Sequence, residues 1–223
     1  MRILVINPNT TQAMTDEIAQ VARAAAATGT EIDCVSPESG PRSIEGYTDE
    51  VLAAYHTVDL VAQTKGRYDG YVIACFGDPA IAACREISDV PVVGIAEAAF
   101  HMASLVAYKW SIVTVLPRVK PFMEEVVHRN GMEHKCASIR CTPLTVLEIE
   151  ADIEQNEDWI AHAMLDADMR AAAGLKVPSN DYKGAPLYIF TKANVAKAGT
   201  PPDPAKGYGN AYRQGFAKLW RVG

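Results

Sequence analysis

The segment YVIACFGDPA, residues 71–80, decides the fold class, because an apolar run in it leads directly to a helix start. The run Gly70–Ala74 is short and rich in residues that favour buried strands. Asp78 followed by Pro79 is typical of a helix start, with aspartate as the N-cap and proline in the first turn. A strand that leads into a helix is the repeating unit of a doubly wound parallel sheet.

The same unit recurs on both sides of this segment. We expect further strands at Arg2–Ile6, Glu31–Val35 and Pro91–Ile95, and helices at Thr11–Ala27, Asp49–Thr64 and Asp78–Ile87. Strands separated by helices predict a parallel sheet with helices on its faces.

The pattern restarts after residue 97. We expect helices at Ala98–Ala107, Val119–Asn130, Ile153–Ala173 and Tyr212–Trp220, strands at Trp110–Val115 and Pro186–Phe190, extended or loop segments at Ala137–Thr142 and Val146–Leu147, and a loop at Ala198–Gly209. The sequence therefore predicts an α/β fold with two lobes. Residues 1–97 with 205–223 would form the first lobe, and residues 98–204 the second.

Composition narrows the class of function. The net charge of −6 gives no basic field to attract nucleic acid or an anionic membrane. No window approaches the roughly 20 apolar residues of a membrane span, and Pro8 interrupts the first apolar run, so we expect a cytoplasmic protein without a signal peptide. The five cysteines are scattered and odd in number, which predicts neither disulfides nor a metal site.

Cys75 and Asn9 follow two of the expected strands, where ligands of open parallel sheets bind. Amide N–H groups at the expected helix start would favour a Cys75 thiolate, and Gly77 permits a sharp turn there. The alternative is that Cys75 is a small buried hydrophobic residue. Asn9 or Thr10 either caps the following helix or binds a carboxylate or amide substrate. The chain has no Walker loop or GxGxxG, so we expect no nucleotide cofactor.

Several segments, in this order, resemble the hydantoin racemases of the aspartate/glutamate/hydantoin racemase superfamily. They are RILVINPNTT (2–11), GPRSIEGYTDE (40–50), YVIACFGDPA (71–80), VPVVGIAEAAFHMA (90–103), WSIVTVLPR (110–118) and RCTPLTVLEIE (140–150). The resemblance implies two pseudo-symmetric lobes with a cleft between them, and an often oligomeric enzyme. It implies that each lobe supplies one cysteine for proton transfer, without metal or organic cofactor.

By this resemblance Cys75 is the acid/base of the first lobe, acting on a small molecule such as a 5-substituted hydantoin or allantoin. The residues expected around the substrate are Asn9, Thr10, Ser43, Ile44, Glu45, Phe76, Gly77, Asp78, Thr114, Val115 and Leu116. C5 of a hydantoin lies beside a carbonyl, so its carbanion is an enolate that hydrogen bonds can stabilise.

The sequence departs from the family at the second cysteine, which family members carry after a strand of the second lobe. No cysteine follows Cys141, and Thr191 and Lys192 stand where it is expected. Only about two dozen residues separate Ala173 from Lys197, roughly half of what the usual elements need. We therefore expect an incomplete second lobe and a racemase. One-sided proton transfer, as in decarboxylases of the arylmalonate type, and a silent ligand-binding homologue are the alternatives.

Overall fold

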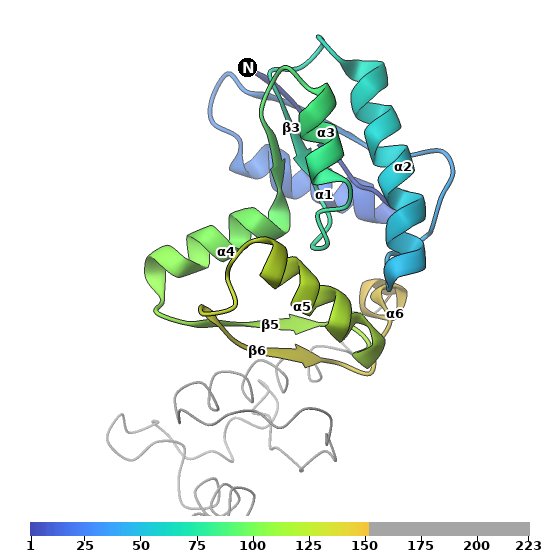
Figure 1. Ribbon diagram of the computed structural model, residues 1–223. Coiled ribbons are helices and arrows are strands. Elements are labelled where there is room, and N and C mark those ends of the chain that lie inside the picture. The colour runs from blue at the N-terminus through green and yellow to red at the C-terminus, as the bar shows by residue number, and fades with distance from the viewer. Residues whose placement is uncertain (152–223) are drawn as a thin grey trace, which may run out of the picture. The chain divides into compact units, whose positions relative to one another are not determined.

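Two parallel sheets organise the part of the chain that the computed structural model describes, residues 1–151 (Figure 1). These residues all belong to one compact unit, Met1–Leu175. The second unit, Lys176–Gly223, lies outside the described residues. The α/β class with parallel sheets is therefore confirmed, whereas the predicted lobe boundaries and the cleft stay predictions.

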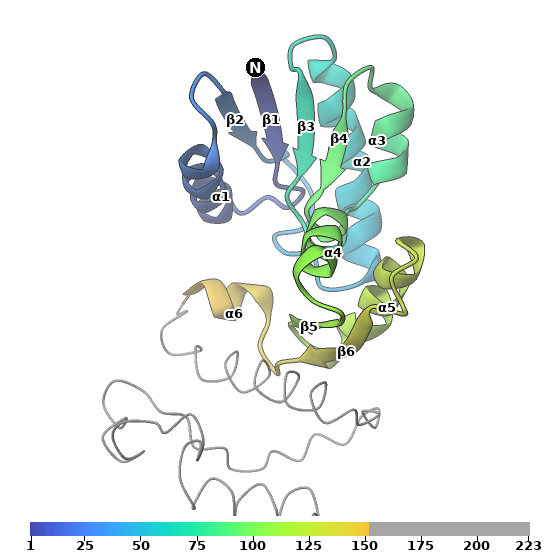
Figure 2. The ribbon, with the colours of Figure 1, turned by 90° about the vertical axis from the view of Figure 1, so that its left-hand side faces the viewer.

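The first sheet has four parallel strands in the order β2-β1-β3-β4 (Figure 2). The strands are β1 (Arg2–Ile6), β2 (Glu31–Val35), β3 (Gly70–Ile73) and β4 (Val92–Gly94), and the helices between them are α1 (Gln12–Ala25), α2 (Tyr47–Thr64) and α3 (Ile81–Ile87). Helices α2 and α3 lie side by side on one face of the sheet, and α1 lies on the other. This is the predicted doubly wound arrangement.

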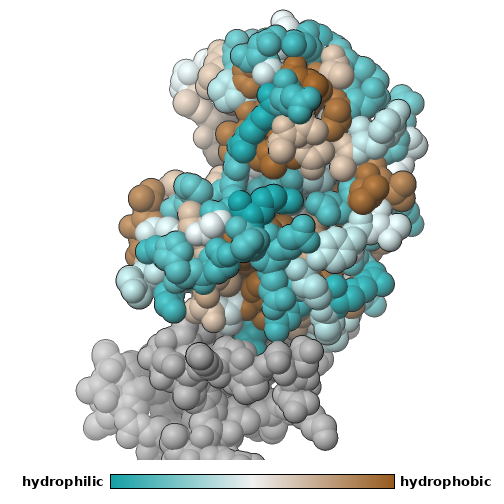
Figure 3. All heavy atoms as spheres, viewed as in Figure 1, coloured by the Kyte–Doolittle hydropathy of each residue, from teal (hydrophilic) through white to brown (hydrophobic). Residues whose placement is uncertain are grey.

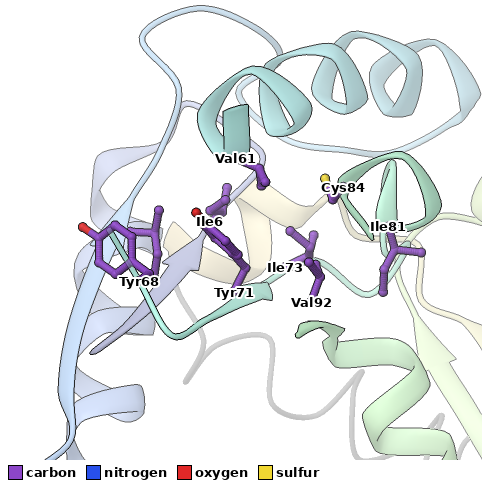
Figure 4. Packing of buried hydrophobic residues seen from close by; sticks show 9 residues of the cluster. Ile6, Val61, Tyr68, Tyr71, Ile73, Ile81, Cys84 and Val92 are labelled. Atoms are coloured by element: carbon purple, nitrogen blue, oxygen red, sulfur yellow. The ribbon is translucent and has the colours of Figure 1, made fainter. Parts of the chain in front are cut away.

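The core of the first sheet explains why its two central strands, β1 and β3, are mostly apolar. Ile6 of β1 and Ile73 of β3 are fully buried, and Val61 of α2 and Cys84 of α3 are directed toward them (Figure 4). Burying one such aliphatic side chain stabilises a fold by about 1.5–3 kcal/mol. Cys84 is therefore a packing residue, as its place on the apolar face of α3 indicates.

The second sheet pairs two parallel strands, β5 (Trp110–Thr114) and β6 (Cys136–Cys141). Around it lie α4 (Ile95–Val106), the 3-10 helix η1 (Pro117–Val119), α5 (Lys120–Arg129) and α6 (Val146–Ala151). Phe100 of α4 stacks on Trp110 with 4.7 Å between ring centroids, and Phe122 and Val126 of α5 complete this core.

Two expectations about the elements are wrong. The helix expected from Asp78 begins at Ile81, because Asp78 and Ala80 have φ of 45° and 57°, outside the right-handed helical region. Val146–Leu147 begins α6 rather than an extended segment or loop. The expected helices at 153–173 and 212–220, the strand at 186–190 and the loop at 198–209 lie outside the described residues.

The surface of the described part shows no segregation of hydrophobic residues on the face in Figure 3, where small hydrophobic groups lie between hydrophilic ones. Within residues 1–151, no helix combines the length and apolar character that crossing a membrane requires. The same residues contain no group of three or more His, Cys, Asp or Glu side chains arranged to hold a metal ion.

Candidate functional site

The candidate site lies at the point of the first sheet where the chain changes the direction in which it winds from strand to strand. From β1 the chain passes through α1 to β2 on one side, whereas from β3 it passes through α3 to β4 on the other. Ile6 pairs with Ile73, and the Ala74 N–H donates to the Ile6 carbonyl at 2.8 Å. The segments beginning at Asn7 and at Cys75 therefore leave adjacent strands at the carboxyl edge, the switch point where open α/β sheets bind ligands.

Cys75 opens a tight turn at this edge. The Asp78 N–H donates to the Cys75 carbonyl at 2.9 Å, and the Gly77 N–H donates to the Cys75 thiol. The Cys75 residue is partly exposed, in contrast to the fully buried Cys84. A thiol in a turn at this edge of the sheet, with a backbone N–H beside it, is suitably placed to exchange a proton with a molecule bound there.

The pKa of the Cys75 thiol is raised to about 11, mainly because the protein environment displaces water from it. The Gly77 N–H lowers the pKa, and the carboxylates of Asp78 and Glu50 raise it further. At that pKa about one thiol in ten thousand is ionised at pH 7. The expectation that a helix terminus stabilises the thiolate is wrong, because α3 begins only at Ile81 and desolvation outweighs the single N–H.

Asp78 serves another helix than the one that follows it. Its buried carboxylate accepts hydrogen bonds at 2.9 Å from the N–H groups of Ala96 and Glu97, in the first turn of α4. A Cβ on Gly94 would lie 2.2 Å from the Asp78 Cγ, so only glycine fits there. Burial raises the pKa of the Asp78 carboxyl, and the two N–H groups lower it. Asp78 therefore contributes its backbone to the turn, while its side chain caps α4.

Helix α5 packs against the Cys75 turn from the second core. A Cβ on Gly77 would lie 2.5 Å from the Cζ of Phe122, so the ring of Phe122 lies against the bare backbone of the turn. The Arg129 guanidinium donates to the Gly77 carbonyl at 2.7 Å. Phe76 extends the same contact, since its ring meets that of Phe100 edge-on at 5.5 Å. Arg129 could not be predicted from the sequence, because an arginine at a helix end is common.

Asn9 is engaged in the start of α1. Its side-chain oxygen accepts hydrogen bonds from the Thr11 N–H at 2.8 Å and from the Asn7 amide at 3.0 Å. Its own amide nitrogen contacts the weak acceptor Met14 Sδ at 3.2 Å. The expectation that Asn9 or Thr10 caps this helix is wrong, because Thr11 is the N-cap of α1 and the Asn9 oxygen forms a local turn just before it. The amide N–H groups are the part of the Asn9 side chain with bonding capacity to offer a substrate.

The segment before α2 is anchored through the buried carboxylate of Glu45. This carboxylate accepts hydrogen bonds from the Ser43 hydroxyl at 3.2 Å, the Val146 N–H at 2.9 Å and the Arg118 guanidinium at 2.7 Å. Thr10 ties the same segment to the end of β1, since its N–H donates to the Pro41 carbonyl at 2.9 Å. Glu45 thus joins residues of the first sheet to the second.

Three of the expected site residues come from the end of β5. The Thr114 carbonyl accepts from the Thr142 N–H at 2.8 Å, and the Leu116 N–H donates to the Leu144 carbonyl at 3.2 Å. Val115 and Leu116 are partly buried against the same hydrophobic cluster as Phe76. The structure therefore relates this segment to the Cys75 turn through a shared core. The roles of Ile44 and of these residues in substrate binding stay predictions.

Comparisons with known proteins agree with this geometry. The model of the family described as Asp/Glu/Hydantoin racemase matches residues 3–174. A hydantoin racemase of Paenarthrobacter aurescens is 47% identical over 154 residues, which cover 68% of this chain and 65% of the relative. A hydantoin racemase of Pseudomonas sp. (strain NS671) is 47% identical over 155 residues, covering 69% and 62%. The matches thus span less than two thirds of these relatives' length.

Two structures of allantoin racemases are similar in fold. That from Klebsiella pneumoniae superposes with a TM-score of 0.67 at 33% identity, covering 87% of this chain and 98% of that chain. That from Pseudomonas fluorescens gives a TM-score of 0.70 at 34% identity, covering 79% and 84%.

Proposed function

Because this chain belongs to the Asp/Glu/hydantoin racemase family, we propose that it is a cofactor-independent racemase that inverts C5 of a 5-substituted hydantoin or of allantoin. The observation that carries the proposal is the partly exposed Cys75 at the switch point of the first sheet, in a turn whose backbone N–H reaches its thiol. Kinship to hydantoin racemases at 47% identity and to allantoin racemases at 33–34% supports this substrate class.

The proposed chemistry begins with the Cys75 thiolate as the base. The C5–H bond breaks, the proton moves to the Cys75 sulfur, and the electron pair moves into the adjacent carbonyl to form an enolate. Hydrogen-bond donors at this edge of the sheet, among them the Asn9 amide, stabilise the charge on the enolate oxygen. A proton donor on the opposite face of the ring then forms a new C5–H bond. A weakly acidic thiol gives a scarce but strong base, which suits a weak carbon acid.

The test follows an enantiopure 5-substituted hydantoin, and allantoin separately, in deuterated buffer with the wild-type protein. Proton NMR measures loss of the C5–H signal, and polarimetry measures loss of optical rotation. We expect both signals to change together when the protein is present. A protein-free control measures the uncatalysed exchange and racemisation, which are subtracted. Exchange with retained configuration would establish one-sided proton transfer instead, and the absence of both signals would refute enzymatic activity on these substrates.

Two further expectations concern the setting of the reaction. A cytoplasmic location and a homo-oligomeric assembly, both expected from the sequence and its resemblance, remain predictions. The oligomeric state is measured directly by light scattering on the purified chain.

A further inference from the structure

We propose that Arg129 is a positioning residue for the Cys75 thiol, holding the Cys75–Asp78 turn in shape and offsetting the negative charge of the carboxylates Asp78 and Glu50. The inference rests on the proposed role of Cys75 for its bearing on turnover. What it predicts is the ionisation of the Cys75 thiol, which can be measured without any substrate.

A chain of two hydrogen bonds connects the guanidinium to Cys75. Arg129 donates to the Gly77 carbonyl at 2.7 Å, and the N–H of the same peptide unit, that of Asp78, donates to the Cys75 carbonyl at 2.9 Å. A peptide polarised by a cation at its carbonyl is a stronger donor at its N–H. The guanidinium therefore strengthens the bond that closes the turn, and the closed turn presents the Gly77 N–H to the thiol.

The charges around Cys75 also support a role for Arg129. Two carboxylates, Asp78 and Glu50, act unfavourably on a Cys75 thiolate, and the Arg129 charge acts favourably on both carboxylates. Glu97 faces Asp78, and Glu125 faces Glu50, each adding negative charge. Among residues 1–151 no carboxylate lies within ion-pair distance of Arg129, so its charge is not neutralised by a direct partner.

A simpler role, capping the end of α5, does not account for these contacts. The carbonyls near the end of α5 are satisfied by other groups. The Asn130 side chain donates to the Val126 carbonyl at 2.8 Å, and the Gly131 N–H donates to the His128 carbonyl at 2.8 Å. Arg129 is left to reach across to a different segment of the chain, 52 residues away in sequence.

The test measures alkylation of Cys75 by iodoacetamide, a neutral reagent, between pH 7.5 and 10.5, with labelled peptides quantified by mass spectrometry. The variants are Arg129→Met, which removes the charge and the donors, and Arg129→Lys, which keeps the charge. Arg23→Met is the matched control, because Arg23 also donates to a backbone carbonyl, that of Ile32, but on α1 and away from the turn.

We expect Arg129→Met to slow Cys75 alkylation at pH 8 by about three- to tenfold. The loss of the guanidinium weakens the turn and leaves the charges of Asp78 and Glu50 without compensation, which together should move the thiol's ionisation by about half to one pH unit. Arg129→Lys should recover most of that loss, and Arg23→Met should match the wild type. An unchanged rate in Arg129→Met, an equal loss in both Arg129 variants, or failure of both to fold would overturn the proposal. Lack of racemase activity in the wild type would refute the proposed function alone.

Discussion

Replacing Asp78 tests whether its carboxylate connects the turn after β3 to the first turn of α4. In Asp78→Ala, two N–H groups of α4, those of Ala96 and Glu97, lose a charged acceptor at 2.9 Å. Hydrogen bonds to charged groups contribute about 1.5–3 kcal/mol each. The raised pKa of Asp78 shows that burying its charge offsets part of this gain. We therefore expect a net loss of about 2–4 kcal/mol in the free energy of unfolding.

The partner of Asp78 in this prediction is Gly94. A Cβ at Gly94 would lie 2.2–2.4 Å from the carboxyl atoms of Asp78, so Gly94→Ala should cost about 2–4 kcal/mol in the wild-type background. In the Asp78→Ala background the overlapping atoms are gone, and Gly94→Ala should cost less than about 1 kcal/mol. The two substitutions should therefore be non-additive by at least about 1 kcal/mol.

Urea unfolding followed by circular dichroism measures all four members of this double-mutant cycle. Asp59→Asn is a suitable control, because Asp59 lies exposed on α2 and bonds only to the neighbouring Gln63 among the described residues. Additive losses in the cycle, or a loss in Asp78→Ala no larger than that in Asp59→Asn, would refute the assignment of Asp78 as the cap of α4.

Two other substitutions probe the same region. Gly77→Ala places a Cβ 2.5 Å from Phe122 Cζ, so we expect the turn to shift and C5 exchange to slow by at least about tenfold. Adding Phe122→Leu to the same chain should recover part of the rate. A Gly77→Ala protein as active as the wild type would contradict the packing of Phe122 against the turn. Burial raises the pKa of Cys84 from 9.0 to about 11, so the folded state keeps a proton that the unfolded chain releases above pH 9. Stability should therefore fall between pH 9 and 11, by up to about 3 kcal/mol from this thiol. Urea unfolding of Cys84→Ala across that range should show a shallower fall, and an identical pH dependence would contradict the burial effect.

The strands were predictable because their signal is local. Arg2–Ile6 is observed as expected, since a strand buried in a parallel sheet requires apolar side chains on both faces. Glu31–Val35 is also observed as expected, although it is an edge strand without a fully buried residue. The position of Cys75 at the carboxyl edge followed from the same pattern. The change of winding direction that makes this edge the candidate site could not be predicted, because it depends on which strands pair.

What the sequence did not predict depends on contacts between distant segments. Asp78 and Pro79 carry the local signature of a helix start, yet the Asp78 carboxylate is taken by α4, which begins at Ile95. The contact of Arg129 with Gly77 spans 52 residues and leaves no local trace. Local signals therefore located the candidate site, while burial and hydrogen bonds between distant segments determine the pKa shifts of its side chains.

The central claim is that the Cys75 sulfur moves the C5 proton, and deuterium uptake at C5 by the Cys75→Ser protein tests it most directly. Because a hydroxyl is a far weaker acid than a thiol, we expect uptake at least about a thousandfold slower than in the wild type, with an unchanged thermal unfolding curve. Uptake within about tenfold of the wild-type rate would contradict the claim and remove Cys75 from the mechanism.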